Sequence, residues 1–155
     1  MPAKVKPIPD GYHAITPYLS IKGAAQAIDF YKRAFGANEI MRMNQPDGRV
    51  GHTELQLGDS KIMLADEYPE MDFKSPTSIG GTPVHLHFYV DDCDVVVKQA
   101  QAAGAKVLRP VADQFYGDRS GAVQDPFGHV WHISTHKEDL SADEIAKRAA
   151  AQHKK

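Results

Sequence analysis

The sequence predicts an α+β fold of two tandem βαβββ modules that form a curved mixed sheet around a pocket, followed by a C-terminal helix. Three observations predict it: two helix-like segments that end alike, a strand-like run before each, and a strand with a hairpin after each. A shift of 69 residues places Ile21 on Val90 and Met63 on His132, so the two halves share almost one register. The shared order of elements, rather than sequence identity, carries this prediction.

Each half contains one amphipathic helix that ends at a glycine. Apolar residues recur at helical spacing over residues 24–35 and again over residues 93–103. Gly36 and Gly104 follow, where a helix favours a left-handed C-terminal residue. Asp92 stands where a side chain can cap the second helix. These features predict a helix with defined ends in each module.

Strand-like runs over residues 16–21 and 85–90 precede the two helices. The later hairpins turn at residues 58–60 and 125–128, which hold the glycine, aspartate and proline that turns favour. Pairing across a tight turn at Asp59 and Ser60 predicts that Gln56 lies opposite Met63, with Glu54 opposite Ala65.

The length of 155 residues fits one domain made of two modules that share a core. The boundaries fall at about residues 12–67 for module one, 68–83 for a linker rich in Pro, Gly, Ser and Thr, and 84–136 for module two. A capped helix over about residues 141–152 ends the chain.

Composition excludes several classes of partner. A net charge of −2 gives no electrostatic reason to expect nucleic acid. No apolar run approaches the roughly 20 residues of a membrane span, and the N-terminus lacks the apolar segment of a secretory signal. The single cysteine cannot form an intrachain disulfide, which suits a reducing cytoplasm. We therefore expect a cytoplasmic protein.

Strand alternation separates a helix-facing side from a second, polar side of each sheet. His85, His87 and Tyr89 share the second side of one strand, and His132 faces the same way in the last strand. An ordinary solvated face would carry Lys, Glu and Thr instead. Histidines and aromatics gathered there predict a partly enclosed pocket for a small molecule.

The chain resembles the glyoxalase/bleomycin-resistance/dioxygenase superfamily, also called the vicinal oxygen chelate fold, and within it the PhnB-like proteins. The segments AIDFYKRAFGA, GHTELQLGDSKIMLADE and YGDRSGAVQDPFGHVWHISTHKEDLS carry this resemblance, which spans about residues 12–147. It implies a homodimer, in which modules can be exchanged between subunits.

The resemblance also implies one divalent metal with four ligands, at positions that correspond to Thr16, Met63, His85 and His132. Thr16 and Met63 are poor ligands for the metals that this fold favours. Glu54 lies beside Met63 and can replace it, which gives His85, His132 and Glu54 as the predicted ligands of zinc, nickel, manganese or iron. The alternative is a metal-free pocket in which these histidines only form hydrogen bonds.

Two functions from different classes follow. The first is a metal-assisted lyase, isomerase or dioxygenase acting on a small oxygenated substrate, with His87, Tyr89 and Glu54 as catalytic residues. The second is a metal-free protein that sequesters a hydrophobic or aromatic compound. In both, the predicted substrate-binding residues are Tyr18, Met63, Phe115, Tyr116 and Arg119. Whether the protein is an enzyme stays open between the two.

Overall fold

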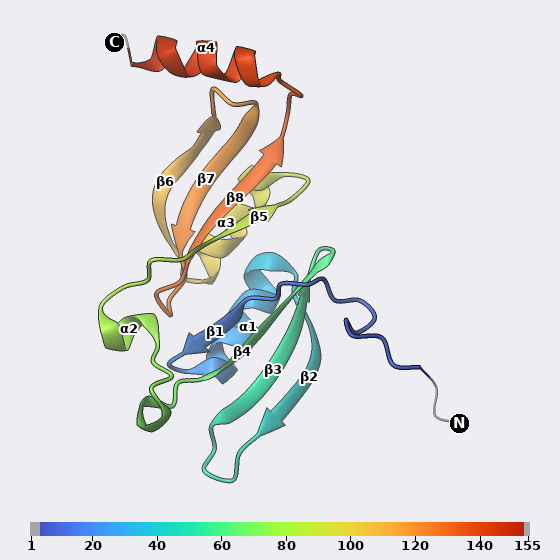
Figure 1. Cartoon of the computed structure of the whole chain (residues 1–155). Helices are drawn as coiled ribbons and strands as arrows, with labels where there is room; N and C mark the ends of the chain where they lie inside the picture. The colour runs from blue at the N-terminus through green and yellow to red at the C-terminus, as the bar shows by residue number, and fades with distance from the viewer. Residues whose placement is uncertain (1–3, 154–155) are drawn as a thin grey trace. The chain divides into compact units, whose positions relative to one another are not determined.

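The structure is a computed structural model that describes residues 4–153. The chain divides into two compact units between Ile79 and Gly80. Each unit carries its own four-stranded mixed sheet and a helix connecting its first two strands (Figure 1).

Unit one holds the first βαβββ module. Its sheet has the order β1-β4-β3-β2, in which β1 runs parallel to β4 and the other pairs are antiparallel. Its elements are β1 (Tyr18–Ile21), α1 (Ala24–Phe35), β2 (Asn38–Asn44), β3 (Val50–Leu57) and β4 (Ser60–Asp66). The predicted linker contains a 3-10 helix, η1 (Pro69–Met71), and a short helix, α2 (Pro76–Ile79).

Unit two repeats this topology with the order β5-β8-β7-β6. The elements are β5 (His85–Tyr89), α3 (Cys93–Ala103), β6 (Lys106–Asp113), β7 (Asp118–Gln124), β8 (Val130–His136) and the C-terminal α4 (Ala142–Gln152). The α+β fold of two βαβββ modules is therefore confirmed. One difference is that β1 begins at Tyr18, whereas its counterpart β5 begins at the equivalent of Thr16.

The last strand of each module supplies a side chain that caps the start of its helix. In unit one, Oδ1 of Asp66 accepts hydrogen bonds from the backbone N–H groups of Gly23 (3.1 Å) and Ala24 (2.8 Å). In unit two, Oγ1 of Thr135 accepts one from the N–H of Cys93 at 2.9 Å. The shift of 69 residues relates Asp66 to Thr135, so the repeat extends to the side chains that satisfy the first N–H groups of the helix.

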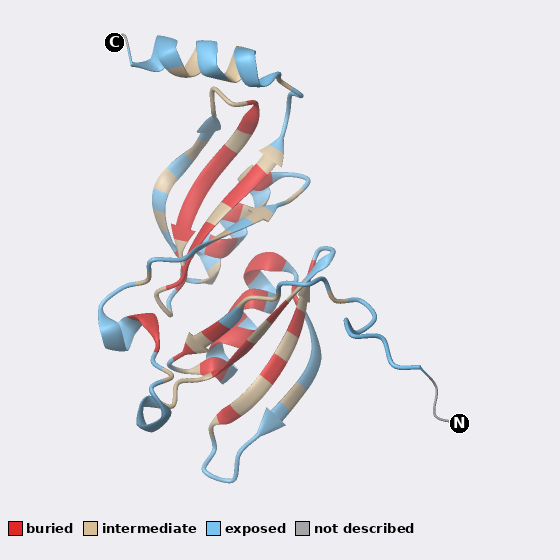
Figure 2. Cartoon of the chain, in the orientation of Figure 1, coloured by how far each residue is buried: buried red, intermediate tan, exposed pale blue. Residues whose placement is uncertain are grey.

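The core of each unit lies between the sheet and its helix. Figure 2 shows buried positions concentrated in the inner strands and in helices α1 and α3, whereas the edge strands β2 and β6 are largely exposed. Leu55 and Leu64 in unit one and Ile133 in unit two are fully buried. Helix α4 buries none of its residues and begins with Ser141, whose hydroxyl accepts a hydrogen bond from the N–H of Glu144.

The register of the first hairpin differs from the prediction. Glu54 pairs with Met63 and Gln56 with Lys61, because the chain turns at Gly58 and Asp59 rather than at Asp59 and Ser60. Gly58 has a φ of 58°, a left-handed conformation that glycine adopts without steric cost and that a two-residue hairpin turn requires. The predicted pairing was therefore wrong by two residues. Since the error is even, every side chain keeps its predicted face.

Candidate functional site

The polar face of unit two is built by β5 and β8, which run side by side. His85, His87 and Tyr89 alternate along β5 with Leu86 and Phe88, so the three share one face. His87 lies directly opposite His132 in the parallel ladder. The predicted grouping of these histidines on one face is what the structure shows.

His85 and His132 form a hydrogen-bonded pair. Nδ1 of His85 lies 2.9 Å from Nε2 of His132, and the ring of His87 stacks on that of His132 at 5.8 Å between centroids. Burial lowers the pKa of His132, and the charges of His85, Arg109 and His87 lower it further. His132 is therefore held as a neutral imidazole, the form that accepts a hydrogen bond or ligates a metal.

A second polar chain begins at Tyr89. Its hydroxyl donates to Oδ2 of Asp118 at 2.7 Å, and Oδ1 of Asp118 lies 2.7 Å from Nδ1 of His136. Nε2 of His136 lies 2.7 Å from Oδ1 of Asp139. Burial acts to raise the pKa of Asp118, but the hydrogen bonds from His136 and Tyr89 outweigh it and hold that pKa below its ordinary value. The hydrogen bond to Asp118, followed by burial, raises the pKa of Tyr89.

The corresponding face of unit one carries a shorter polar chain. The hydroxyl of Tyr18 lies 2.7 Å from Nδ1 of His52, and Nε2 of His52 lies 2.7 Å from Oε2 of Glu54. This spacing fits an imidazole that accepts from the phenol and donates to the carboxylate. Burial, and then the nearby Tyr68, raise the pKa of Tyr18.

Two hollows within unit one flank this row of hydrogen-bonded side chains. The first, about 510 Å³, is lined by Tyr18, Gln45, Gly51, Ala65, Tyr68, Met71 and Phe73. The second, about 520 Å³, lies under the N-terminal segment of residues 7–14 and is lined further by Thr16, Glu54 and Met63. Both have the size of small-molecule sites.

The predicted metal ligands come from both units. His85 and His132 belong to unit two and bind each other, whereas Glu54 belongs to unit one and binds His52. Across residues 4–153, no three or more His, Cys, Asp or Glu side chains are grouped so that they could hold a metal ion. Structural and catalytic zinc sites use at least three protein ligands. The two imidazoles of unit two therefore do not by themselves make a metal site.

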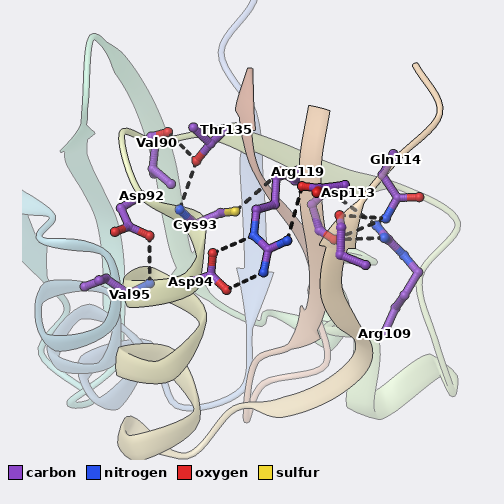
Figure 3. Close-up of polar contacts among 12 residues, drawn as sticks. Val90, Asp92, Cys93, Asp94, Val95, Arg109, Asp113, Gln114, Arg119 and Thr135 are labelled. Carbon is purple, nitrogen blue, oxygen red and sulfur yellow. Dashed lines mark hydrogen bonds and ion pairs between the residues drawn. The ribbon is translucent and has the colours of Figure 1, made fainter. Parts of the chain in front are cut away.

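The remaining predicted substrate-binding residues lie around the β6–β7 turn. Phe115 and Tyr116 contact each other edge to face at 5.2 Å. Arg119 turns towards α3, where its Nε donates to Oδ2 of Asp94 at 2.7 Å, and Nη1 reaches Asp113 at 3.2 Å (Figure 3). Its guanidinium is thus occupied by two carboxylates on the helix side of the sheet.

Arg109 is a polar-face residue that the sequence reasoning missed. It lies in β6 opposite Ala122, and its guanidinium donates to the carbonyl and hydroxyl oxygens of Ser120. The pairing of β6 with β7 is irregular on both sides of Arg109, which breaks the two-residue alternation of side chains. Sequence spacing therefore could not predict on which face of the sheet Arg109 lies. An arginine within a strand-like run was the only signal that sequence offered.

Comparison with known proteins agrees with this architecture. The model of the Glyoxalase/Bleomycin resistance protein/Dioxygenase superfamily matches residues 13–133. The uncharacterized protein Rv0887c of Mycobacterium tuberculosis is 42% identical over 142 residues, which cover 90% of this chain and 84% of the relative.

Solved structures share the fold. TioX from Micromonospora sp. ML1 superposes with a TM-score of 0.61 at 25% identity, covering 83% of this chain and all of that one. A PhnB protein from Bacillus cereus superposes with a TM-score of 0.62 at 20% identity, covering 79% of this chain and 99% of that one, which shows a PhnB-like fold. No helix in the described part of the chain is long and apolar enough to span a bilayer. The repeated βαβββ topology and the match over residues 13–133 together show that the chain belongs to the Glyoxalase/Bleomycin resistance protein/Dioxygenase superfamily.

Proposed function

We propose that this protein binds a small oxygenated or aromatic molecule on the polar faces of its sheets and holds no resident metal. Members of the superfamily bind small molecules. The observation that carries the proposal is the hollow of about 510 Å³ in unit one, into which Tyr18, Tyr68 and Phe73 bring aromatic rings.

The rings of this hollow are held in place before any ligand arrives. Tyr18 and Phe73 meet edge to face at 5.7 Å, and the guanidinium of Arg49 lies 3.9 Å from the ring centre of Tyr68. Arg49 is itself fixed by Glu70 at 2.7 Å. Rigid aromatic walls lose little entropy on binding, so they favour a flat ligand. The Tyr18 hydroxyl, which donates its proton to His52, can still accept a hydrogen bond from a ligand O–H group.

The chemistry of the donor set supports a metal-free ligand site. Superfamily members often use a divalent metal, yet Met63 and Thr16 stand at two of the four positions that the resemblance assigns to ligands. A thioether is a soft ligand and binds hard metals weakly, whereas it makes favourable contacts with aromatic rings. Met63 lies beside Glu54 in the second hollow of unit one, where it suits an apolar part of a ligand.

The test is a calorimetric titration of the full-length, untagged protein with a panel of phenols and naphthols. We expect saturable binding that Tyr18→Ala weakens about tenfold, the loss expected for one well-packed aromatic contact and one hydrogen bond. Tyr18→Phe separates the hydroxyl from the ring. Gln26→Ala, at an exposed position of α1 on the helix side of the sheet, is the control and should leave the affinity unchanged. Absence of binding to the whole panel would contradict the proposal.

One observation favours the metal-dependent lyase, isomerase or dioxygenase as a second candidate. Two imidazole nitrogens on a tetrahedral zinc ion lie roughly 3.3 Å apart, so the facing nitrogens of His85 and His132, at 2.9 Å, would need to separate only slightly to share one metal ion. The predicted third ligand is Glu54, with His87 or Tyr89 as the acid or base. Metal content of the purified protein separates the two candidates.

We further propose that the protein is a cytoplasmic homodimer, since superfamily members often form dimers. Sedimentation equilibrium on the full chain gives the number of subunits directly. A monomer at all concentrations would contradict this proposal without affecting the binding site of unit one.

A further inference from the structure

Arg109 lies at one end of a row of side chains that crosses the sheet of unit two. The row runs from Arg109 in β6 through Ala122 in β7 to His132 in β8 and His87 in β5, because each residue is the register partner of the next. Directly paired residues of neighbouring strands point to the same face, so Arg109 and His132 share the polar face of this sheet. Ala122, which stands between them, has the smallest side chain of the row.

Arg109 is a half-buried cation without a carboxylate partner. Arg42, Arg49, Arg119 and Arg148 all form ion pairs with aspartate or glutamate. Within residues 4–153, no carboxylate lies within ion-pair distance of Arg109. A charge that is partly removed from water is costly unless an opposite charge compensates it. A small anion bound to Arg109 would remove this cost.

The guanidinium is held by a rigid, fully buried support. Nη1 of Arg109 donates to the carbonyl oxygen of Ser120 at 3.1 Å, and Nη2 donates to its hydroxyl at 3.3 Å. Ser134 donates to the same hydroxyl at 2.7 Å, and both serines are 0% exposed.

A guanidinium has five N–H donors. The described residues engage two, so three N–H bonds remain to bind a ligand. Figure 3 shows Arg109 on the other side of the sheet from Arg119, whose donors are taken by Asp94 and Asp113.

His132 can add a further donor. When Nδ1–H of His85 donates to Nε2 of His132, the neutral imidazole of His132 carries its own proton on Nδ1. That N–H is then free of the histidine pair. In this tautomer, Arg109 and His132 flank Ala122 with one fork of charged donors and one neutral donor, a pattern suited to two oxygens of one anionic group.

We infer that the polar face of unit two binds the oxyanion group of a small ligand, a carboxylate or a phosphate, through Arg109 and His132 across Ala122. This inference goes beyond the proposed function, because it places a second binding site, for a ligand with a negative charge, on unit two rather than in the hollow of unit one. The aromatic part of such a ligand would lie against His87 and Tyr89, whose rings are 4.8 Å apart.

The test compares three probes by calorimetry on the full-length, untagged protein, in a buffer without phosphate or carboxylate at near-physiological salt. Benzoate and inorganic phosphate carry the oxyanion, whereas benzyl alcohol is a neutral analogue of benzoate. We expect at least one anion to bind, and Arg109→Gln to weaken it about tenfold or more, because charge-assisted hydrogen bonds are lost. Lys106→Gln removes one positive charge from an exposed position of the same strand and should change affinity less than about twofold.

The outcomes distinguish this inference from the proposed function. If benzyl alcohol binds as tightly as benzoate, and phosphate does not bind, the oxyanion inference is overturned while the proposed function stands. If neither benzoate nor phosphate binds, the inference is overturned as well. Equal losses of anion affinity in Arg109→Gln and Lys106→Gln would also overturn it, because the removal of any nearby positive charge would then have the same effect. If Arg109→Gln does not fold, Arg109→Lys is measured instead, because it keeps the positive charge and removes the planar fork of donors. Benzoate affinity equal to that of the wild type in Arg109→Lys would overturn the inference that the guanidinium binds the anion through this fork.

Discussion

Nδ1 of His85 lies 2.9 Å from Nε2 of His132, although 47 residues separate the two along the chain. The parallel ladder of β5 and β8 creates this contact, since it pairs His87 directly with His132 and leaves His85 one position away on the same face. Each histidine therefore has one nitrogen already engaged. This arrangement decides how many donors remain for a ligand or a metal.

The metal content of the protein is expected to be well below one ion per chain. Two mutually bonded imidazoles supply too few ligands, and Met63 and Thr16 are poor replacements. Elemental analysis of untagged protein, before and after incubation with excess zinc, nickel, manganese or iron, measures this. Near-stoichiometric metal that disappears in His132→Ala would favour the metal-dependent enzyme instead.

The contact between Asp118 and His136 is expected to make stability depend on pH. The hydrogen bonds to Asp118 and Asp139 raise the pKa of His136, so its contribution is complete below its ordinary value of 6.5 and is lost as pH rises through the folded pKa. The pKa of Asp118 is lowered, so its contribution is present above its ordinary value of 3.8 and is lost as pH falls through the folded pKa. Both Asp118 and His136 therefore stabilise the folded state fully between pH 3.8 and pH 6.5.

Thermal unfolding of His136→Gln across this range tests the expectation. The melting temperature of the variant should fall furthest below that of the wild type near pH ~5.5, and the difference should narrow near pH ~8.5. His153→Gln, at an exposed position just after α4, is the matched control and should show no such trend. A difference that is constant with pH would show that His136 acts by packing alone.

Gly117 is expected to tolerate alanine less well than Gly48. Both have positive φ, 97° and 91°, so each substitution carries a conformational cost of about 1–2 kcal/mol. A Cβ at Gly117 would also lie 2.7 Å from the carbonyl oxygen of Glu138, whereas one at Gly48 would have nothing within 4 Å. Urea unfolding should therefore show a larger loss of stability in Gly117→Ala. Equal losses would mean that the segment after β8 moves aside without cost.

Asp66 is expected to stabilise unit one through three backbone N–H groups. Its carboxylate accepts from Gly23 and Ala24 at the start of α1, and from Val50 at 2.7 Å at the start of β3. Asp66→Ala should lower the free energy of unfolding by about 1–2 kcal/mol, the usual cost of a lost helix cap. Asp66→Asn keeps one acceptor oxygen and should cost less.

The control for this prediction is Asp29→Ala, at an exposed position within α1. This change removes an aspartate from the same helix without removing a cap, and alanine is the better helix former. Denaturant unfolding should leave it close to the wild type. A loss as large as that of Asp66→Ala would show that net charge, rather than capping, explains the effect.

Local patterns were sufficient to predict the modules and their helices. The glycine at position 36 has a φ of 69° and ends α1, and Asp92 caps α3 by accepting from the N–H of Val95. These features depend on residues close together in the sequence, so spacing and residue type determine them. Strand alternation likewise predicted that His85, His87 and His132 share a face, because a two-residue period survives an even error in register.

Contacts between strands required the tertiary structure. The bonds of His52 to Tyr18, and of Asp118 to Tyr89 and His136, join side chains whose spacing in the sequence carries no signal of contact. Arg119 was predicted in the pocket, and the structure places its guanidinium against Asp94 and Asp113.

The sequence by itself determined the family, the repeated topology and the residue types on the polar face, because these follow from local periodicity and motif. Only the tertiary structure decided which of those residues meet. Irregularities in β6 turn Arg109 onto the polar face, and the β5–β8 ladder brings His85 onto His132. Register and bulges are set by packing across the whole sheet, so no local pattern specifies them.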